Sequence, residues 1–395
     1  MGITRRLAAS AAAVALLAGL TGGAWAASPG EIADAVNAIF KSKSNGSEIT
    51  LGTPTQQDGN IVFKDVVIKD PHAEETKIGV LTFANANVAD GGKKVTADAV
   101  VAELVTGGAD KDTFAIDQIE LTNPVLSAKD EDSKIDSVAL NNITITPAGK
   151  KPVTIASAGF DLGDFANDIP HSVDLSIEGM NLDPASLDDA GSTAAQLKAI
   201  GYDKLELSFY GSGSLDQSNG NLTIEEITID GTDIGSLTLS GELSGVTDDI
   251  LKSLGKNEMT PEIAGKVNVK SASLYYGDAS LAGRLIAMQA KAAGQEPGAF
   301  VDQITGALPL MLSMIGNPGF QDKLAKGATT FLKDPKNLQI SAAPEKPLSL
   351  IELFGLAQTA PQTLPDVLKA DVLANQDEQE DDGDVDSGDA PAPKN

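Results

Sequence analysis

The chain has 395 residues, no cysteine, and 56 acidic residues against 29 lysines and arginines, which gives a formal net charge of −27. This acidic excess repels phosphate backbones and argues against nucleic acid as a partner, while the lack of cysteine excludes disulfides and thiol chemistry. The length suffices for a sizeable core. That core must consist of aliphatic residues and the eleven Phe, because the chain has only one Trp and its four Tyr all lie in one middle segment.

Residues 1–26 have the pattern of a secretory signal peptide. Arg5 and Arg6 precede the apolar run Leu7–Leu20, and the small-residue triplet Ala24-Trp25-Ala26 follows. This order predicts export to the periplasm with cleavage after Ala26. If the segment were retained instead, it would act as a membrane anchor, because it is uncharged over about 18 residues.

A short helix is predicted within residues 27–46. Ser28 is a candidate N-cap, Pro29 occupies the first helical position, and apolar residues at helical spacing form one face.

Residues 47–276 predict a mainly antiparallel sheet. Asp58-Gly59 and Asn219-Gly220 are hairpin turn signals, and apolar residues alternate with polar ones, as in Leu237, Leu239 and Leu243. A period of two buries one face of a sheet and leaves the other in water. With the helices that follow, the fold class is α+β, with a curved, amphipathic sheet.

A loose repeat recurs within this region. Each copy has three apolar residues: the second lies three positions after the first, and the third lies two positions after the second. Copies begin at Phe63, Ile116, Ile135 and Ile224, with a weaker copy at Ile177. A spacing of three puts the first two on opposite faces of a regular strand, whereas a one-residue bulge returns them to one face. The copies start at irregular intervals, which excludes a solenoid of fixed period. The alternative to a true internal repeat is that strands followed by turns converge on similar sequences.

Residues 277–375 are predicted to be mostly helical, with a strand returning at Leu338–Ala342. The apolar stripes of these helices are most simply core packing. The alternative is an apolar pocket beside a kink at Pro309, with Leu308, Met311 and Ile315 as candidate ligand-binding residues. The longest apolar run, Ala307–Ile315, is about half of a membrane span, so no transmembrane span is expected in the mature chain.

The final segment, 376–395, contains eight acidic residues and no large apolar residue beyond Val385. Such a composition cannot bury enough surface to fold, so the segment is predicted to be a disordered acidic tail.

No motif in the chain predicts catalysis. His72 and His171 each follow a proline and are expected in surface loops, and neither has the spacing of a zinc site. Ser253-Leu254-Gly255-Lys256 matches the SxxK motif of penicillin-binding enzymes but lacks its companion elements, and the acidic run at 381–389 departs from a calcium loop. We therefore predict no catalytic, metal-binding or cofactor-binding residue, and a protein that is not an enzyme.

Three segments in order resemble uncharacterised exported proteins of alphaproteobacteria: Ile200–Leu207, Tyr275–Leu281 and Ala343–Leu350. This resemblance covers about residues 200–374. Through the strand repeats alone, the chain also looks distantly similar to AsmA-like envelope proteins. The latter resemblance implies a long amphipathic sheet that cradles lipid, and it carries no catalytic residue over to this chain. The absence of a retained anchor departs from that pattern and counts against a bridging role.

These observations favour a non-enzymatic periplasmic envelope protein that binds an apolar ligand such as lipid, or another envelope protein, through its amphipathic sheet. One alternative is a scaffold or adaptor whose acidic surface docks a basic partner. Another is an envelope hydrolase with an unrecognised site.

Overall fold

The computed structural model describes residues 27–44, 46–72, 74–109, 111–129, 132–166, 169–186, 192–256 and 258–376. The predicted signal peptide lies outside the described residues, and so does the predicted acidic tail apart from Gln376.

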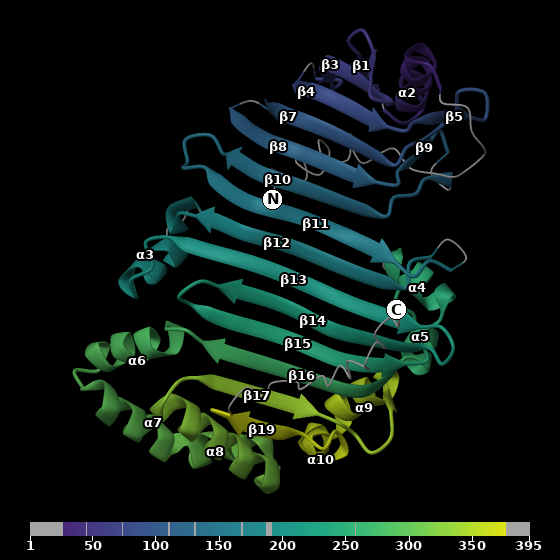
Figure 1. Ribbon diagram of the computed structural model, residues 1–395. Helices are drawn as coiled ribbons and strands as arrows, with labels where there is room; N and C mark the ends of the chain where they lie inside the picture. The colour runs from purple at the N-terminus through teal and green to yellow at the C-terminus, as the bar shows by residue number, and fades with distance from the viewer. Residues whose placement is uncertain are drawn as a thin grey trace, which may run out of the picture.

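One large antiparallel sheet dominates the molecule (Figure 1). Its strands are β1 (Glu48–Thr50), β2 (Thr55–Gln57), β3 (Asn60–Lys69), β4 (Glu75–Ala84), β7 (Ala99–Ala109), β8 (Asp112–Thr122), β10 (Ser137–Thr146), β11 (Val153–Gly163), β12 (Ser172–Leu182), β13 (Leu205–Asp216), β14 (Asn221–Gly231), β15 (Gly235–Ser244), β16 (Asn268–Asp278), β17 (Asn337–Ala342), β18 (Leu348–Ser349) and β19 (Asp371–Ala374). Along its main path these strands follow the chain order, from β1 to β19. A small second sheet contains β5 (Asn87–Ala89), β6 (Lys94–Thr96) and β9 (Val125–Ser127).

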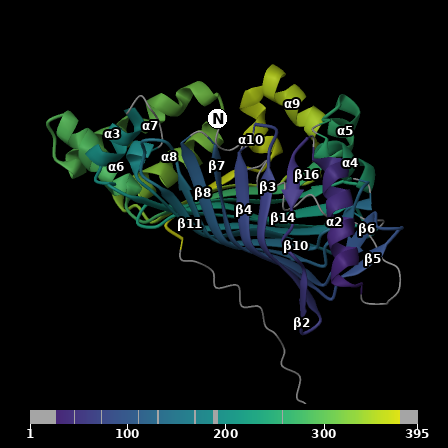
Figure 2. The same ribbon diagram turned by 90° about the horizontal axis from the view of Figure 1, so that it is seen from above.

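The helices flank this sheet and rise on one side of it (Figure 2). They are α2 (Pro29–Lys43), η2 (Pro184–Ser186), α3 (Ser192–Ala199), α4 (Asp248–Gly255), α5 (Pro261–Lys266), α6 (Leu281–Ala292), α7 (Pro297–Leu312), η3 (Ser313–Ile315), α8 (Pro318–Lys333), α9 (Leu350–Thr359), η4 (Pro361–Thr363) and α10 (Leu364–Val367). The α+β prediction is confirmed. The predicted return strand is β17. Two further strands between and after the C-terminal helices also join the sheet: β18 pairs with β16, and β19 pairs with β17.

The predicted N-terminal helix is α2, and its first turn forms as expected. The Ser28 hydroxyl accepts a hydrogen bond from the Glu31 backbone N–H, and the Glu31 carboxylate accepts one from the Ser28 backbone N–H. Such a capping box satisfies backbone donors that have no partner within the helix. The apolar face of α2 packs on the N-terminal strands and completes the main hydrophobic core.

A continuous apolar face crosses the whole sheet. Residues directly opposite in an antiparallel pair share a face, so the strand register traces one row of side chains from β3 to β19. Every member of this row is apolar: Phe63, Leu81, Ala102, Ile119, Leu140, Ala158, Ile177, Phe209, Ile229, Leu237, Tyr276, Leu338 and Ala374. We call the face that contains this row the apolar face.

The irregular spacing of three is explained by local backbone conformation. In β3, Asp65 adopts a positive φ of 55°, and both Phe63 and Val66 are buried on the apolar face. In β14 the register shifts between Ile224 and Ile227, as a one-residue bulge requires. These departures from a regular strand return the first two apolar residues of the repeat to one face.

Candidate functional site

The apolar face is buried at its N-terminal end and open farther along. Phe63 and Ile61 of β3 are at most 1% exposed in the core to which α2 also contributes, whereas Ile229 of β14 is 52% exposed. The open part, from β12 to β17, is the feature that we regard as the candidate site. Its exposed large residues are Val173, Leu175, Ile227, Ile229, Leu237, Leu239, Leu274 and Ile340.

These side chains form two adjacent rows across the strands. One row places Leu175, Gly211, Ile227, Leu239, Leu274 and Ile340 in successive strands, and the other contains Ile229 and Leu237. A Cβ built at Gly211 would lie 3.8 Å from the Phe209 ring, in ordinary van der Waals contact with it. The arrangement is a broad apolar surface.

The C-terminal end of the apolar face is covered by α8. Phe331 is buried and packs edge-to-face on Tyr276, with ring centroids 5.8 Å apart. The Tyr276 hydroxyl donates a hydrogen bond to the Asp278 carboxylate at 2.6 Å. Burial and this carboxylate raise the pKa of Tyr276, so the phenol stays neutral and keeps its hydrogen bond. The exposed rows thus lie between two covered ends of one sheet.

The three residues proposed from the sequence lie elsewhere. Leu308 is buried on α7, Met311 is 62% exposed on the same helix, and Ile315 is half-buried in η3. The helix continues through Pro309 to Leu312. The structure therefore does not bring these residues together with the exposed strand residues.

Sequence reasoning missed the strand residues because their alternation looked like ordinary core. One signal was present in the sequence. The strands of 172–278 alternate apolar and polar residues as regularly as the earlier ones, but only short helices interrupt them. Those helices are too few to cover the apolar face, which leaves it in contact with water.

Helix α7 is more apolar than we expected. Together with η3 it gives a 19-residue segment, Pro297–Ile315, that has the length and composition of a membrane span, and only 6% of its most apolar window is buried. The expectation that no such segment follows the signal was therefore wrong, because the estimate counted only Ala307–Ile315. Asp302 within this helix forms an ion pair with Lys333 of α8 at 3.3 Å.

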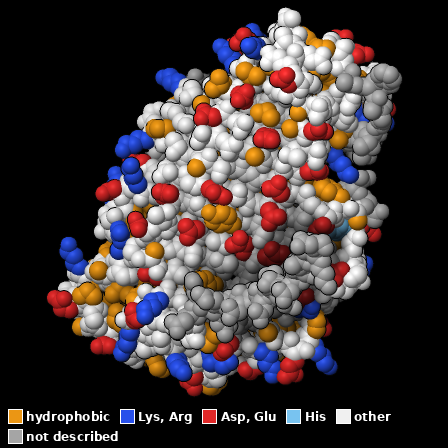
Figure 3. Space-filling view, viewed as in Figure 1, with side chains coloured by type: hydrophobic (Ala, Val, Ile, Leu, Met, Phe, Trp, Pro, Cys, Tyr) orange, Lys and Arg blue, Asp and Glu red, His pale blue; other side chains and the backbone are white. Residues whose placement is uncertain are grey.

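The opposite face of the sheet is polar and acidic. Figure 3 shows Asp and Glu side chains scattered over the middle of the strands, with Lys and Arg mainly toward the margins. A shallow hollow of about 270 Å³ on the sheet includes Asp161, Asp174, Glu226 and Tyr210 in its lining. Within the part of the chain that the structure describes, no group of three or more His, Asp or Glu residues is placed to hold a metal ion.

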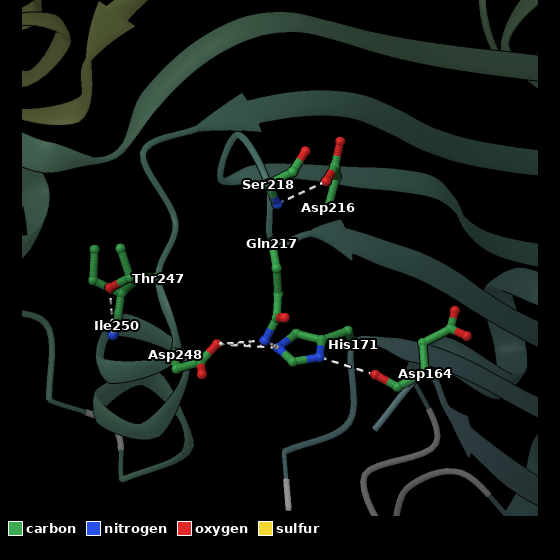
Figure 4. Close-up of polar contacts among 8 residues, drawn as sticks. All are labelled: Asp164, His171, Asp216, Gln217, Ser218, Thr247, Asp248 and Ile250. Atoms are coloured by element: carbon green, nitrogen blue, oxygen red, sulfur yellow. Dashed lines mark hydrogen bonds and ion pairs between the residues drawn. The ribbon is translucent and has the colours of Figure 1, made fainter. Parts of the chain in front are cut away.

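His171 is buried, which corrects the expectation that it lies in a surface loop; His72 is exposed as expected. Figure 4 shows His171 between the end of β11, the β13–β14 turn and the start of α4. The Asp164 carbonyl lies 2.9 Å from Nδ1, and both the Asp248 carboxylate and the Gln217 amide lie within 3.0 Å of Nε2.

The contacts of His171 define its protonation behaviour. Hydrogen bonding to Asp248 raises the pKa of His171 above its ordinary value and outweighs burial, which acts in the opposite direction. The protonated ring donates Nε2–H to Asp248, whereas a neutral ring with Nδ1–H bound to the Asp164 carbonyl accepts from Gln217. No nucleophile bonds to the ring among these contacts, so the cluster ties three loops together.

The comparisons with known proteins add little about function. Residues 228–375 match the model of a family described only as an uncharacterized protein. No curated protein matches the sequence.

Proposed function

We propose that this protein is a non-enzymatic periplasmic envelope protein that binds the hydrocarbon part of a lipid on its apolar face. The observation that carries the proposal is the set of eight large apolar residues, from Val173 to Ile340, that are 37–52% exposed on one continuous face. Isolated exposed apolar residues need no explanation, but a contiguous patch marks an interaction surface.

The dimensions of the open face suit an extended acyl chain. Neighbouring strands lie about 4.8 Å apart, so the open rows from β12 to β17 extend over roughly 25 Å across the strands. Each methylene that leaves water contributes about 0.8 kcal/mol, which favours a long chain lying along the rows.

Titration with a fluorescent fatty-acid probe tests the proposal on two adjacent residues of β15. Leu239 lies on the apolar face and Ser240 on the polar face, and both belong to β15. Leu239→Asp should weaken probe binding at least roughly tenfold, because a carboxylate replaces an apolar contact worth about 1.5 kcal/mol or more. Ser240→Asp adds the same charge to the same strand and should leave the affinity unchanged.

Wild-type protein that binds no probe, or equal losses in both variants, would contradict lipid binding. Circular dichroism of both variants establishes that they are folded.

A second candidate function is docking of a basic envelope partner, which the acidic polar face favours (Figure 3). Such docking would weaken steeply with salt, because exposed charges are screened over about 10 Å at 0.1 M. Copurification of a basic protein at low salt, lost at high salt and insensitive to Leu239→Asp, would support this function over lipid binding.

A further inference from the structure

Helix α7 and η3 present large apolar side chains to water near their C-terminal end. Leu310 is 79% exposed, Met311 is 62% exposed and Met314 is 94% exposed. Helix α7 packs through its other side on α8, and the Asp302–Lys333 ion pair fixes it there. These three residues therefore take no part in the hydrophobic core.

Helix α9 also presents large apolar side chains to water. In α9, Phe354 is 69% exposed and Ile351 is 46% exposed. Buried Asn317, just after η3, donates hydrogen bonds from Nδ2 to the Gln362 carbonyl at 3.1 Å and to the Asp366 carboxylate at 2.9 Å. Figure 2 shows α7 and α9 on the same side of the sheet. We call the exposed residues Leu310, Met311, Met314, Ile351 and Phe354 the helix patch.

The helix patch lies in an electrically neutral part of an otherwise acidic chain. No charged residue occurs from Gln303 to Gln321, and none occurs from Leu353 to Pro365. Residues 297–376 contain seven acidic residues and six lysines, whereas residues 27–296 contain 41 acidic residues and 20 basic ones. Docking through the helix patch therefore brings few charged groups to a lipid surface, where their desolvation would be costly.

We propose that the helix patch docks the protein on the surface of a zwitterionic phospholipid bilayer, with its apolar side chains in the interfacial region. Leu, Met and Phe that are exposed on uncharged stretches of these helices are suited to the boundary between headgroups and acyl chains. A protein partner would be matched by charged groups at the rim of the interface, and the 19 residues from Gln303 to Gln321 contain none. The ion pair of Asp302 and the packing on α8 favour a helix that lies on the membrane over one that spans it.

The inference is independent of ligand binding on the apolar face. It concerns different residues, on helices rather than strands, and it predicts contact with a lipid surface instead of capture of a single lipid. The two proposals can therefore fail separately.

The test uses tryptophan emission as a local probe of insertion. Trp25 is the only tryptophan of the chain, so Trp25→Phe removes the background signal even where the signal peptide is retained. Met311→Trp then places one fluorophore in the helix patch, and Tyr210→Trp places one on the polar face as the matched control. Both chains are mixed with phosphatidylcholine vesicles, with and without brominated acyl chains.

We expect the emission of the Met311→Trp chain to shift to shorter wavelength and to be quenched by the brominated lipid, while the Tyr210→Trp chain shows neither effect. Adding Leu310→Ser to the Met311→Trp chain should lower its vesicle partition coefficient roughly tenfold, because one large apolar contact is lost.

Three results would overturn the inference. The first is an unchanged Met311→Trp emission at all vesicle concentrations. The second is an equal response of the two tryptophan positions. The third is a shift that depends on protein concentration without vesicles, which would identify a second copy of the chain as the occupant. Probe titration without vesicles measures ligand binding on the apolar face separately.

Discussion

The burial gradient along the apolar face makes a quantitative prediction about two isoleucines. Ile61 in β3 is 1% exposed, and Ile229 in β14 is 52% exposed. Both side chains lie on the same face of the same sheet, so Ile61→Ala and Ile229→Ala compare an identical change in chemistry at the covered and the open part of the face.

The expected costs differ because only one site is filled on all sides. Ile61→Ala removes fully buried methyl groups and leaves a cavity in the main hydrophobic core, which lowers the free energy of unfolding by about 2–5 kcal/mol. At Ile229 about half of the side chain is already in water and no closed cavity forms. The loss there should be about 1 kcal/mol, half of the transfer free energy of a buried aliphatic side chain. The change in intrinsic strand preference is common to both variants and cancels in the comparison.

Urea denaturation followed by circular dichroism measures both costs, and an unchanged m-value supports a like-for-like comparison. Probe titration gives the reverse order: Ile229→Ala should weaken fatty-acid binding, and Ile61→Ala should leave the affinity of the folded fraction unchanged. An Ile229→Ala cost as large as that of Ile61→Ala would refute the reasoning, because it would mean that the open rows are covered in solution.

Three further predictions concern other parts of the chain. Because the hydrogen bond to Asp248 raises the pKa of His171 above 6.5, its contribution to stability is complete below about pH 6.5 and is lost as the pH rises through the folded-state pKa. Asp248→Asn should flatten this fall in a series of thermal unfolding curves. Leu104 adopts a φ of 56° and is 63% exposed, so Leu104→Asn should raise the free energy of unfolding by about 0.5–1 kcal/mol in urea denaturation, because Asn tolerates the left-handed region better. We also predict export with cleavage after Ala26, so N-terminal sequencing of protein recovered from the periplasm should begin at Ala27; an intact Trp25 would show that the segment is kept as an anchor.

The regular parts of the fold could be predicted because they depend on local pattern. The capping box at Ser28 and Glu31 and the one-face alternation of the strands follow from residue types at fixed spacings. The repeat beginning at Phe63 and Ile224 showed that the backbone must depart from a regular strand. It did not reveal whether a left-handed residue or a bulge does this, because either conformation returns the apolar residues to one face.

The candidate site could not be predicted because exposure is a property of the whole assembly. Ile61 and Ile229 both lie on the apolar face of their strands, and the elements packed on that face determine which one is covered. His171 was misplaced for the same reason. The loop that follows Pro170 has a polar sequence, but residues 77 positions apart, His171 and Asp248, meet there.

The acidity of the chain and its open apolar face are physically related. A sheet that leaves two rows of aliphatic side chains in water invites pairing of two such faces, since each square ångström withdrawn from water contributes about 25 cal/mol. The polar face of the same strands carries carboxylates, and the net charge of −27 makes two copies repel each other. A neutral acyl chain meets no such repulsion, so the same charge that opposes self-association leaves the face available to an uncharged apolar ligand. The acidity therefore favours binding of an acyl chain to the apolar face over pairing with a second copy of the protein. It does so although no residue of the polar face touches the ligand.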